Sequence, residues 1–242
     1  ICQRGGRRYT RAHMIRLVLF DIDGTLIASG GAGVKAIGEV CQAEFGVPDG
    51  TARLHFAGRT DLSIVRDFFE QHRIEPSADN FRRFFDRYVF HLDHLLGQIH
   101  GRVLPGVPEW IRGLQALAQP PVIGLLTGNI RLGAQIKLSH FQLWGRFVMG
   151  AFGDDHEDRN QLARVAQARG NQRLGAKLRG EEILVIGDTP RDIECARAIE
   201  ARVLAVATGG YKLEQLRRDQ PTWAVETLEQ ISVQEVCASA TE

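Results

Sequence analysis

Short apolar runs separated by segments of helix length dominate the second half of the chain. These runs, with a short candidate edge strand at the end, are Ile15–Phe20, Pro121–Thr127, Arg146–Phe152, Glu182–Gly187, Ala201–Thr208 and Thr222–Val225. Runs of this kind are typical of strands buried in a parallel sheet. The segments between the later runs are long enough for crossover helices. The pattern predicts βαβ units and an α/β fold built on a doubly wound parallel sheet.

The interval between the first two runs has a different pattern. It covers about a hundred residues, contains no convincing strand, and places apolar residues at helical spacing in three segments: Val34–Gly46, Asp61–His72 and Ser77–Ile99. Structureless loops of that length are rare in compact domains, so we predict an all-helical insertion. A further helix, Pro105–Leu117, returns the chain to the sheet. The predicted domains are a core formed by 14–28 and 103–242 and a helical insertion at 29–102.

The amino-terminal residues 1–13 contain several arginines, no acids and little apolar periodicity. We expect a disordered extension or a misplaced start there. An Arg-rich, acid-poor segment is also the composition of a transit peptide, although this one is short for that role.

Charge and cysteine content limit the kinds of binding partner and the cellular compartment that we expect. Thirty basic side chains against twenty-nine acidic ones give a net charge of +1, which provides no concentrated positive field for nucleic acid or an anionic membrane. No apolar run approaches the roughly 20 residues of a membrane span. The scattered cysteines indicate reduced thiols in a cytoplasmic protein rather than disulfides or a zinc site; they are Cys2, Cys41, Cys195 and Cys237.

Two carboxylates follow the first apolar run directly, in the stretch LVLFDIDGTL. Asp21 and Asp23 therefore lie at the carboxyl end of a predicted strand, where open α/β sheets bind ligands. In a continuing strand they would point to opposite sides. Gly24 permits a sharp turn and Thr25 can hydrogen-bond it, so both carboxylates can address one site. The alternative is that the acids only cap a turn.

The second run ends in the stretch LLTGN. Thr127 offers a hydroxyl and Gly128 an accessible backbone amide, and both suit a phosphate oxygen. We include Asn129 with them as a candidate phosphate ligand, although Thr-Gly-Asn turns end many strands.

The run at 182–187 is followed by another pair of acids, in the stretch IGDTPRDI. Asp188 lies at the strand end and Asp192 on the first turn of the next helix. A glycine, an acid and a helix start after a buried strand fit a magnesium site, because Mg²⁺ prefers one or two carboxylates together with water. For Asp192 the alternative is that it only complements the helix N-terminus.

The stretches DIDGT, LLTGN and IGDTPRDI, each ending a predicted parallel strand in that order, resemble motifs I, II and IV of the haloacid dehalogenase-like (HAD) hydrolase superfamily. The similarity runs from about Ile15 to the C-terminus and is strongest toward the phosphoglycolate phosphatase-like branch. The insertion after the first motif is similar to the C1 cap of that family. The resemblance implies a Rossmann-like core with an inserted all-helical cap.

What the resemblance implies chemically is magnesium-dependent phosphoryl transfer. Asp21 would be the nucleophile that forms an aspartyl-phosphate. Asp23 would protonate the leaving oxygen and then deprotonate the hydrolytic water. Thr127 and the amide of Gly128 would bind phosphoryl oxygens. The implied Mg²⁺ ligands are the carboxylates of Asp21 and Asp188, the backbone carbonyl of Asp23 and, through water, Asp192.

A doubly charged phosphomonoester meeting the anionic Asp21 also requires a fixed cation. The family supplies it as a lysine or arginine after the third strand, often a lysine followed by proline, and no such pair occurs here. We predict Arg159, because it follows that strand after a short acidic loop and begins a helix. Its guanidinium can bridge a carboxylate and a phosphate. The other basic residues before IGD are Arg164, Arg169, Arg173, Lys177 and Arg179.

Two further stretches surround these motifs. In GDDHEDR, at 153–159, we expect Asp155 or Asp158 to cap the helix and the other acids to be solvated, with contacts to Arg159 as the alternative. In FAGRTD, at 56–61, Arg59 could bind a carboxylate on the substrate as the cap closes. The alternative there is a surface arginine, with Thr60 or Asp61 capping the helix.

The predicted function is hydrolysis of a small, phosphoglycolate-like phosphomonoester. A phosphomutase with the same core residues and a catalytically silent HAD-like binding protein are the alternatives. A response-regulator receiver shares acids after its first strand, but it lacks DGT and a helical insertion. A homodimer stays open, because the sequence does not indicate the oligomeric state.

Overall fold

The computed structural model describes residues 14–237; the predicted extension at 1–13, with Cys2, and residues 238–242 lie outside the described part. A parallel six-stranded sheet in the order β5-β4-β1-β6-β7-β8 forms the centre of the molecule. Its strands are β1 Leu17–Phe20, β4 Val122–Leu126, β5 Met149–Ala151, β6 Ile183–Gly187, β7 Arg202–Val206 and β8 Trp223–Val225. The order reverses between β1 and β6, which places a topological switch point at their carboxyl ends.

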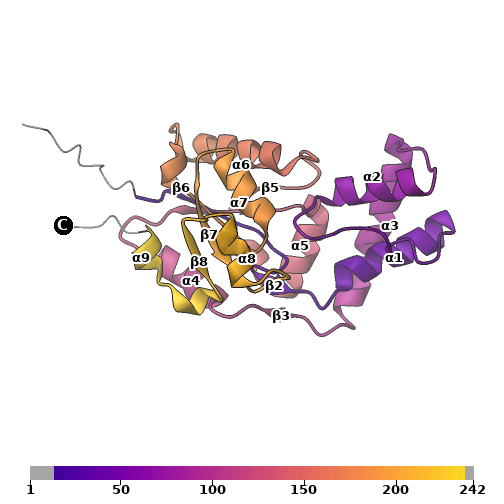
Figure 1. The fold of residues 1–242 in the computed structure, drawn as a ribbon, viewed down its shortest axis with the longest axis horizontal. Coiled ribbons are helices and arrows are strands. Elements are labelled where there is room, and N and C mark those ends of the chain that lie inside the picture. The colour runs from indigo at the N-terminus through magenta and orange to yellow at the C-terminus, as the bar shows by residue number, and fades with distance from the viewer. Residues whose placement is uncertain (1–13, 238–242) are drawn as a thin grey trace, which may run out of the picture.

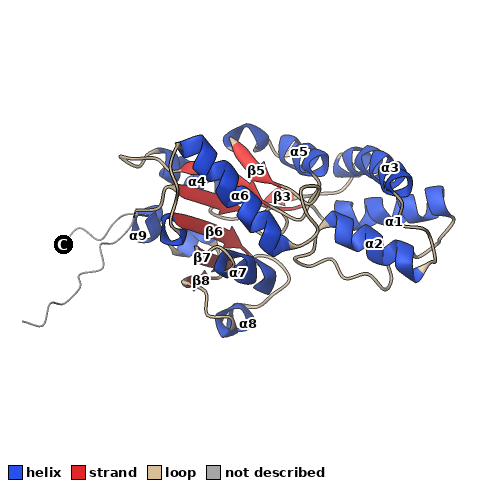
Figure 2. Cartoon of the chain, turned by 90° about the horizontal axis from the view of Figure 1, so that it is seen from above, coloured by secondary structure: helices blue, strands red, loops and turns tan. Residues whose placement is uncertain are grey.

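Alternation along β1 divides the apolar core between the two faces of the sheet. Val18 and Phe20 pack with α4, α5 and α9, whereas Leu17 and Leu19 pack with α6, α7 and α8. Figure 2 looks onto one face of the sheet with α6 in front of the strands, and in Figure 1 α6 lies above the strands and α4 below them. These helices are α4 Val107–Gln115, α5 Arg131–His140, α6 Arg159–Leu174, α7 Pro190–Arg197, α8 Leu213–Arg218 and α9 Val233–Cys237; 3₁₀ turns lie at Trp144–Arg146, Gly180–Glu182 and Leu228–Gln230.

The first three of the four helices between β1 and β4 build an apolar cluster of their own beside the sheet, at the right of Figure 1. They are α1 Ala32–Phe45, α2 Asp61–Gln71 and α3 Ala78–Leu96. Phe68, Phe69 and Phe84 lie fully buried at the centre of this cluster, with Phe45 against them. Phenylalanines at helical spacing therefore give the insertion its own core.

The predicted α/β fold class with a parallel sheet and added helices is confirmed, and every predicted strand and helix is present with shifted ends. The expectation of no strand between the first two runs is wrong. Ile27–Ala28 (β2) and Arg102–Val103 (β3) pair antiparallel where the chain enters and leaves the helical segment. Two residues are too short a segment to show a period, so the sequence pattern does not reveal this pair.

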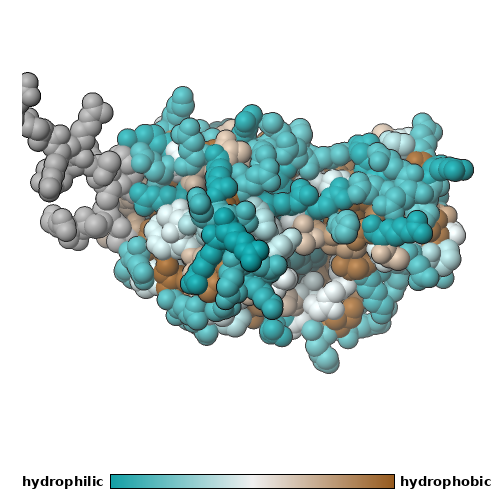
Figure 3. All heavy atoms as spheres, viewed as in Figure 1, coloured by the Kyte–Doolittle hydropathy of each residue, from teal (hydrophilic) through white to brown (hydrophobic). Residues whose placement is uncertain are grey.

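Polar side chains cover most of the face shown in Figure 3, with apolar side chains in small patches. No helix among residues 14–237 combines the length and apolar character needed to cross a bilayer. Within the described residues Cys41, Cys195 and Cys237 are buried free thiols, as predicted.

Candidate active site

The carboxyl end of β1 turns sharply and brings two carboxylates to one cavity. Asp21 is buried, and its amide continues the sheet by donating to the Ile186 carbonyl at 2.9 Å. Gly24 has a φ of 86°, which favours glycine, and a Cβ there would overlap the carboxylate of Asp188. The turn therefore places Asp21 and Asp23 on the same cavity wall, as the glycine predicts.

Three buried acids from the ends of β1 and β6 meet beside this turn. One carboxylate oxygen from each of Asp21, Asp188 and Asp192 lies within 4.8 Å of the others. Asp188 accepts a hydrogen bond from the Thr25 hydroxyl at 3.1 Å. Asp192 accepts from the amide and the hydroxyl of Thr189, at 3.0 and 2.7 Å, in a capping box. Asp192 thus caps α7 with one oxygen and points its other oxygen into the cluster.

Arg159 is the guanidinium that faces this acid cluster. Asp158 caps α6 by accepting from the Asn160 amide at 2.8 Å, so Arg159 occupies the first helical position. Its Nη2 lies 3.5 Å from Asp21 Oδ1 and donates to Asp192. Its Nε is buried and has no hydrogen-bond partner within the described part of the chain. Arg164 is exposed, and Arg169 pairs with Asp155 instead of with the acid cluster.

Burial and mutual repulsion disfavour ionisation of the acids in this cluster. Burial raises the pKa of Asp21 to about 7, against the attraction of Arg159, and the neighbouring Asp192 and Asp23 add to the rise. Burial, with Asp192 and Asp21, also raises the pKa of Asp188 well above its usual range. Burial disfavours the charge of Arg159, but Asp192 and Asp21 outweigh it and raise the pKa of Arg159. Three acids and one guanidinium leave negative charge that is uncompensated.

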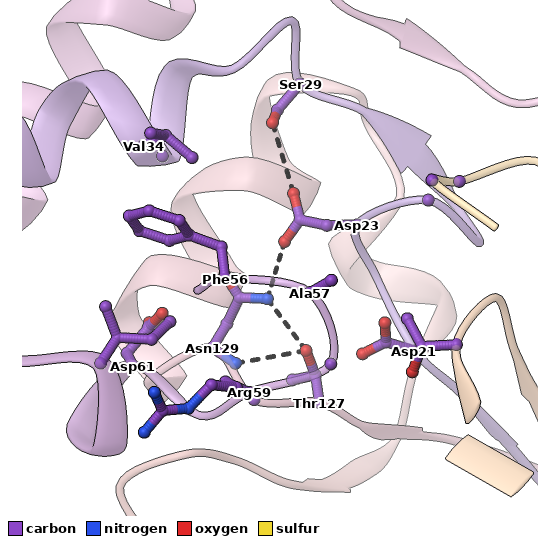
Figure 4. A pocket seen from close by; sticks show the side chains of 18 of the residues that line it. Asp21, Asp23, Ser29, Val34, Phe56, Ala57, Arg59, Asp61, Thr127 and Asn129 are labelled. Carbon is purple, nitrogen blue, oxygen red and sulfur yellow. Dashed lines mark hydrogen bonds between the residues drawn. The ribbon is translucent and has the colours of Figure 1, made fainter. Parts of the chain in front are cut away.

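The turn after β4 lies opposite Asp21 and links to Asp23. Thr127 is fully buried, and its hydroxyl accepts from both nitrogens of Asn129, at 3.3 and 2.9 Å. The Asn129 side chain also donates to Asp23 at 2.9 Å, as Figure 4 shows. A Cβ at Gly128 would overlap the Arg59 carbonyl, so only glycine lets the helical segment approach this turn so closely. Thr127, Gly128 and Asn129 all line the cavity.

Lys137 is a functional candidate that the sequence analysis missed. Its side chain is 5% exposed, and Nζ lies 2.6 Å from both Asp23 Oδ2 and Asn129 Oδ1. Burial acts against ionisation of Asp23, but the charge and hydrogen bond of Lys137, with Asn129 and Ser29, lower its pKa below the usual range. A signal was available, because Lys137 falls among the buried positions of α5 with Ala134 and Leu138. A lysine on an apolar helix face requires a buried acid as its partner.

The helical segment reaches the same cavity through the start of α2. Thr60 caps this helix by accepting from the Ser63 amide. Asp61 is buried and accepts from the Ile130 amide at 2.8 Å, at the start of α5. Burial raises the pKa of Asp61 to about 6, against the attraction of Lys137.

Arg59 lines the cavity, but its guanidinium is already engaged. It donates to the Asp67 carboxylate and, at 3.1 Å, to the Ser63 carbonyl. In Figure 4 it points away from Asp21 and Asp23. Both of these partners lie on α2, so the guanidinium is held toward that helix.

The acids between β5 and α6 mostly follow their prediction. Asp158 caps the helix, Asp154 and Asp155 are exposed to solvent, and Glu157 is partly buried. The last three also accept hydrogen bonds: Asp154 from the Arg131 amide, Asp155 from Arg169, and Glu157 from Arg66.

These residues surround a cavity of about 370 Å³ between the sheet and the helical segment. Side chains from the ends of β1, β4 and β6 line one side of it, and α1, α2 and α3 with their loops line the other. Its position matches the crevice outside the strand ends of open α/β sheets. Its size suits a small ligand.

Comparison with known proteins identifies the family of this chain. The family model described as Haloacid dehalogenase-like hydrolase matches residues 18–206. The chain belongs to the haloacid dehalogenase-like hydrolases. A curated relative named "Probable phosphatase IndB", from Dickeya dadantii (strain 3937), is 24% identical to this HAD-like hydrolase over 225 residues, covering 89% of this chain and 91% of the relative.

Solved structures share the fold of this HAD-like hydrolase. A HAD hydrolase of family IA, variant 3, from Entamoeba histolytica HM-1:IMSS has a TM-score of 0.72 and 18% identity, covering 92% of this chain and 98% of that one. A predicted phosphoglycolate phosphatase from Haemophilus somnus 129PT has a TM-score of 0.67 and 20% identity, covering 88% and 95%. The predicted superfamily and an enzyme of the hydrolase class are confirmed, and phosphatases are among its relatives.

Proposed function

We propose that this HAD-like hydrolase is a magnesium-dependent phosphatase that hydrolyses a small phosphomonoester through an aspartyl-phosphate on Asp21. The observation that carries the proposal is the charge arrangement at the cavity floor. There Asp21 lies 3.5 Å from the guanidinium of Arg159 and beside two further buried acids. An ionised carboxylate held next to a fixed cation can attack a negatively charged phosphoryl group that would otherwise repel it.

In the first half of the reaction, an oxygen of Asp21 bonds to phosphorus and the bond from phosphorus to the leaving alcohol breaks. Thr127 and the amide of Gly128 orient phosphoryl oxygens, and Arg159 neutralises charge on them. The buried Arg159 Nε, which has no partner among the described residues, is an available donor for one such oxygen. A preorganised buried donor of this kind stabilises the transition state without reorganisation.

Asp23 moves the protons. Lys137 and Asn129 hold its carboxylate at 2.6 and 2.9 Å and favour its ionised form. Asp23 therefore begins as an acceptor, and a substrate bound as the monoanion, whose second pKa is near 6, supplies the proton that Asp23 passes to the leaving oxygen. In the second half, Asp23 takes a proton from the water whose oxygen bonds to phosphorus, and the bond from phosphorus to the Asp21 oxygen breaks. Asp23 then passes this proton to the departing phosphate, so both Asp21 and Asp23 are ionised again.

The acid cluster fits a magnesium ion. Its donors are oxygens only, they are buried, and their charge exceeds that of Arg159. Asp21 and Asp188 would hold the ion with their carboxylates and Asp23 with its carbonyl, with Asp192 reaching it through water. A bound Mg²⁺ supplies charge neutralisation for the phosphoryl oxygens and keeps Asp21 ionised.

The test is phosphate release from a panel of phosphomonoesters with and without Mg²⁺. We expect release that depends on Mg²⁺ and falls to background in Asp21→Asn. The matched control is Asp154→Asn, which alters an exposed acid outside the cavity and should retain full activity. Release that is undiminished in Asp21→Asn would contradict the nucleophile. Transfer to a second hydroxyl with no free phosphate would indicate a phosphomutase.

A further inference from the structure

The side of the cavity formed by the helical segment is mostly apolar. Val34 and Ile37 from α1, Phe56 from the loop before α2, and Ile64 from α2 line it. In Figure 4, Val34 and Phe56 lie on the far side of Asp23 from Asp21. A phosphoryl group on Asp21 would direct its leaving group toward these side chains.

Each cation that lines the cavity already has an acid partner. Arg159 pairs with Asp192 and Asp21, Lys137 with Asp23, and Arg59 with Asp67. An anionic leaving group would also meet the partly exposed carboxylate of Asp23 and the buried carboxylate of Asp61. A desolvated anion that meets no free cation binds less well than an uncharged group of the same shape.

Two features of this apolar side of the cavity, called the apolar wall below, indicate which kind of substrate group would pack against it. Val34 is 41% exposed, although large apolar side chains elsewhere in the helical segment are mostly buried. Tyr88 is 1% exposed and lines the cavity, and its hydroxyl makes no hydrogen bond within residues 14–237. The wall thus offers exposed apolar surface and one unused neutral hydrogen-bonding group.

Resting on the proposed phosphatase function, we propose that the substrate is a phosphomonoester of an uncharged alcohol with an apolar or aromatic body. The body packs against Val34 and Phe56, and the Tyr88 hydroxyl bonds a neutral polar atom on it. Phosphorylated carboxylic acids such as phosphoglycolate are rejected, because a second anion finds no unpaired cation in the cavity.

The test compares benzyl phosphate with 4-carboxybenzyl phosphate, which share a leaving oxygen and a ring but differ in charge. We expect kcat/KM for benzyl phosphate to exceed that for the carboxylated ester by about tenfold or more. Equal or faster turnover of the carboxylated ester would overturn the substrate class and leave the phosphatase function standing. Turnover of neither ester, nor of any other phosphomonoester, would contradict the phosphatase function itself.

Two variants test whether the apolar side of the cavity determines the preference for the uncharged ester. Phe56→Ala should lower kcat/KM for benzyl phosphate by about tenfold through KM, because packing is lost. The matched control is Phe90→Ala, which removes a ring that is 68% exposed on α3 and lies outside the cavity. Val34→Lys adds a cation at the wall and should narrow or reverse the preference for the uncharged ester. Unchanged kcat/KM for benzyl phosphate in Phe56→Ala, together with an unchanged preference in Val34→Lys, would place the leaving group elsewhere and overturn the assignment.

Discussion

At the scale of single residues, Arg159 controls the charge that Asp21 carries. We expect Arg159→Ala to lower kcat by about 10²–10³-fold, because the fixed cation beside the attacking carboxylate is lost. Arg164→Ala, on the same helix but exposed, should change kcat little. Steady-state kinetics of both variants on one phosphomonoester provides the check. A larger loss in Arg164→Ala than in Arg159→Ala would show that the wrong arginine has been assigned.

Lys137 should act through Asp23 rather than on the substrate. Lys137→Met removes the ammonium 2.6 Å from Asp23 and leaves that carboxylate less firmly held. We expect kcat to fall by about 10²-fold with little change in KM, because misplaced catalytic groups lose rate before they lose binding.

The control for Lys137→Met is Lys177→Met, which alters an exposed lysine outside the cavity. A rise in KM without a change in kcat would instead make Lys137 a substrate ligand. Unfolding midpoints of both variants should be measured alongside, because removing one partner of a buried pair also destabilises.

Residues at strand ends were predictable, and residues that the helical segment brings to the site were harder to place. Asp21, Thr127 and Asp188 end or follow apolar runs, so the geometry of a parallel sheet alone brings them to one edge. The apolar helix face around Lys137 indicates that this lysine is buried, but not which acid it meets. Its position beside Asp23, and that of Asp61, depends on the packing of α5 against the helical segment, and no local spacing in the sequence records such a contact.

At the scale of elements, Asp61 joins the start of α2 to the start of α5. It accepts from the Ile130 amide at 2.8 Å, where α5 has no side-chain cap of its own. The pKa of Asp61 is raised to about 6 from 3.8, so the folded protein binds this proton more tightly than the unfolded chain. Its contribution to stability is present below pH 3.8 and is lost as pH rises through about 6.

We therefore expect Asp61→Asn to be more stable than the parent at pH 8 by roughly 2–3 kcal/mol, with the difference vanishing near pH 4. Asparagine keeps an oxygen for the Ile130 amide but carries no charge. Urea unfolding at the two pH values measures the difference. Asp154→Asn is the matched control, because its exposed carboxylate accepts from the next amide of the same helix, that of Arg131. Lower stability of Asp61→Asn at pH 8 would contradict the prediction.

Elements with a clear period were predicted well, and those without one were missed. The six strands of the main sheet and the helices α1 to α4 follow apolar runs or helical spacing in the sequence. The pair β2 and β3 consists of two residues each, which pair because they are the two connections between the sheet and the helical segment. The position of this pair depends on where the inserted segment begins and ends. The spacing of apolar residues along the sequence does not reveal those two points.

At the scale of the whole molecule, we expect the cluster of Asp21, Asp188 and Asp192 to make stability depend on divalent metal. Mg²⁺ that binds only the folded protein should stabilise it by about 2.7 kcal/mol at a concentration a hundred times Kd. For a chain of this size each kcal/mol raises Tm by about 2–4 °C. Thermal melts with Mg²⁺ and with EDTA measure this shift.

Asp188→Asn is the informative variant for the metal. It keeps an acceptor for Thr25 but removes one of the repelling charges. We expect its metal-free Tm to rise and its response to Mg²⁺ to disappear. A full Mg²⁺ response in Asp188→Asn would exclude this acid as a ligand.

The central claim is covalent transfer of the phosphoryl group to Asp21. Rapid acid quench during turnover, followed by intact-mass and peptide mass spectrometry, tests it directly. The account predicts a fraction of the protein heavier by one phosphoryl group, located on the peptide that contains Asp21 and absent from Asp21→Asn. Turnover with no phosphorylated protein under any quench time, or with the group on a different residue, would contradict it.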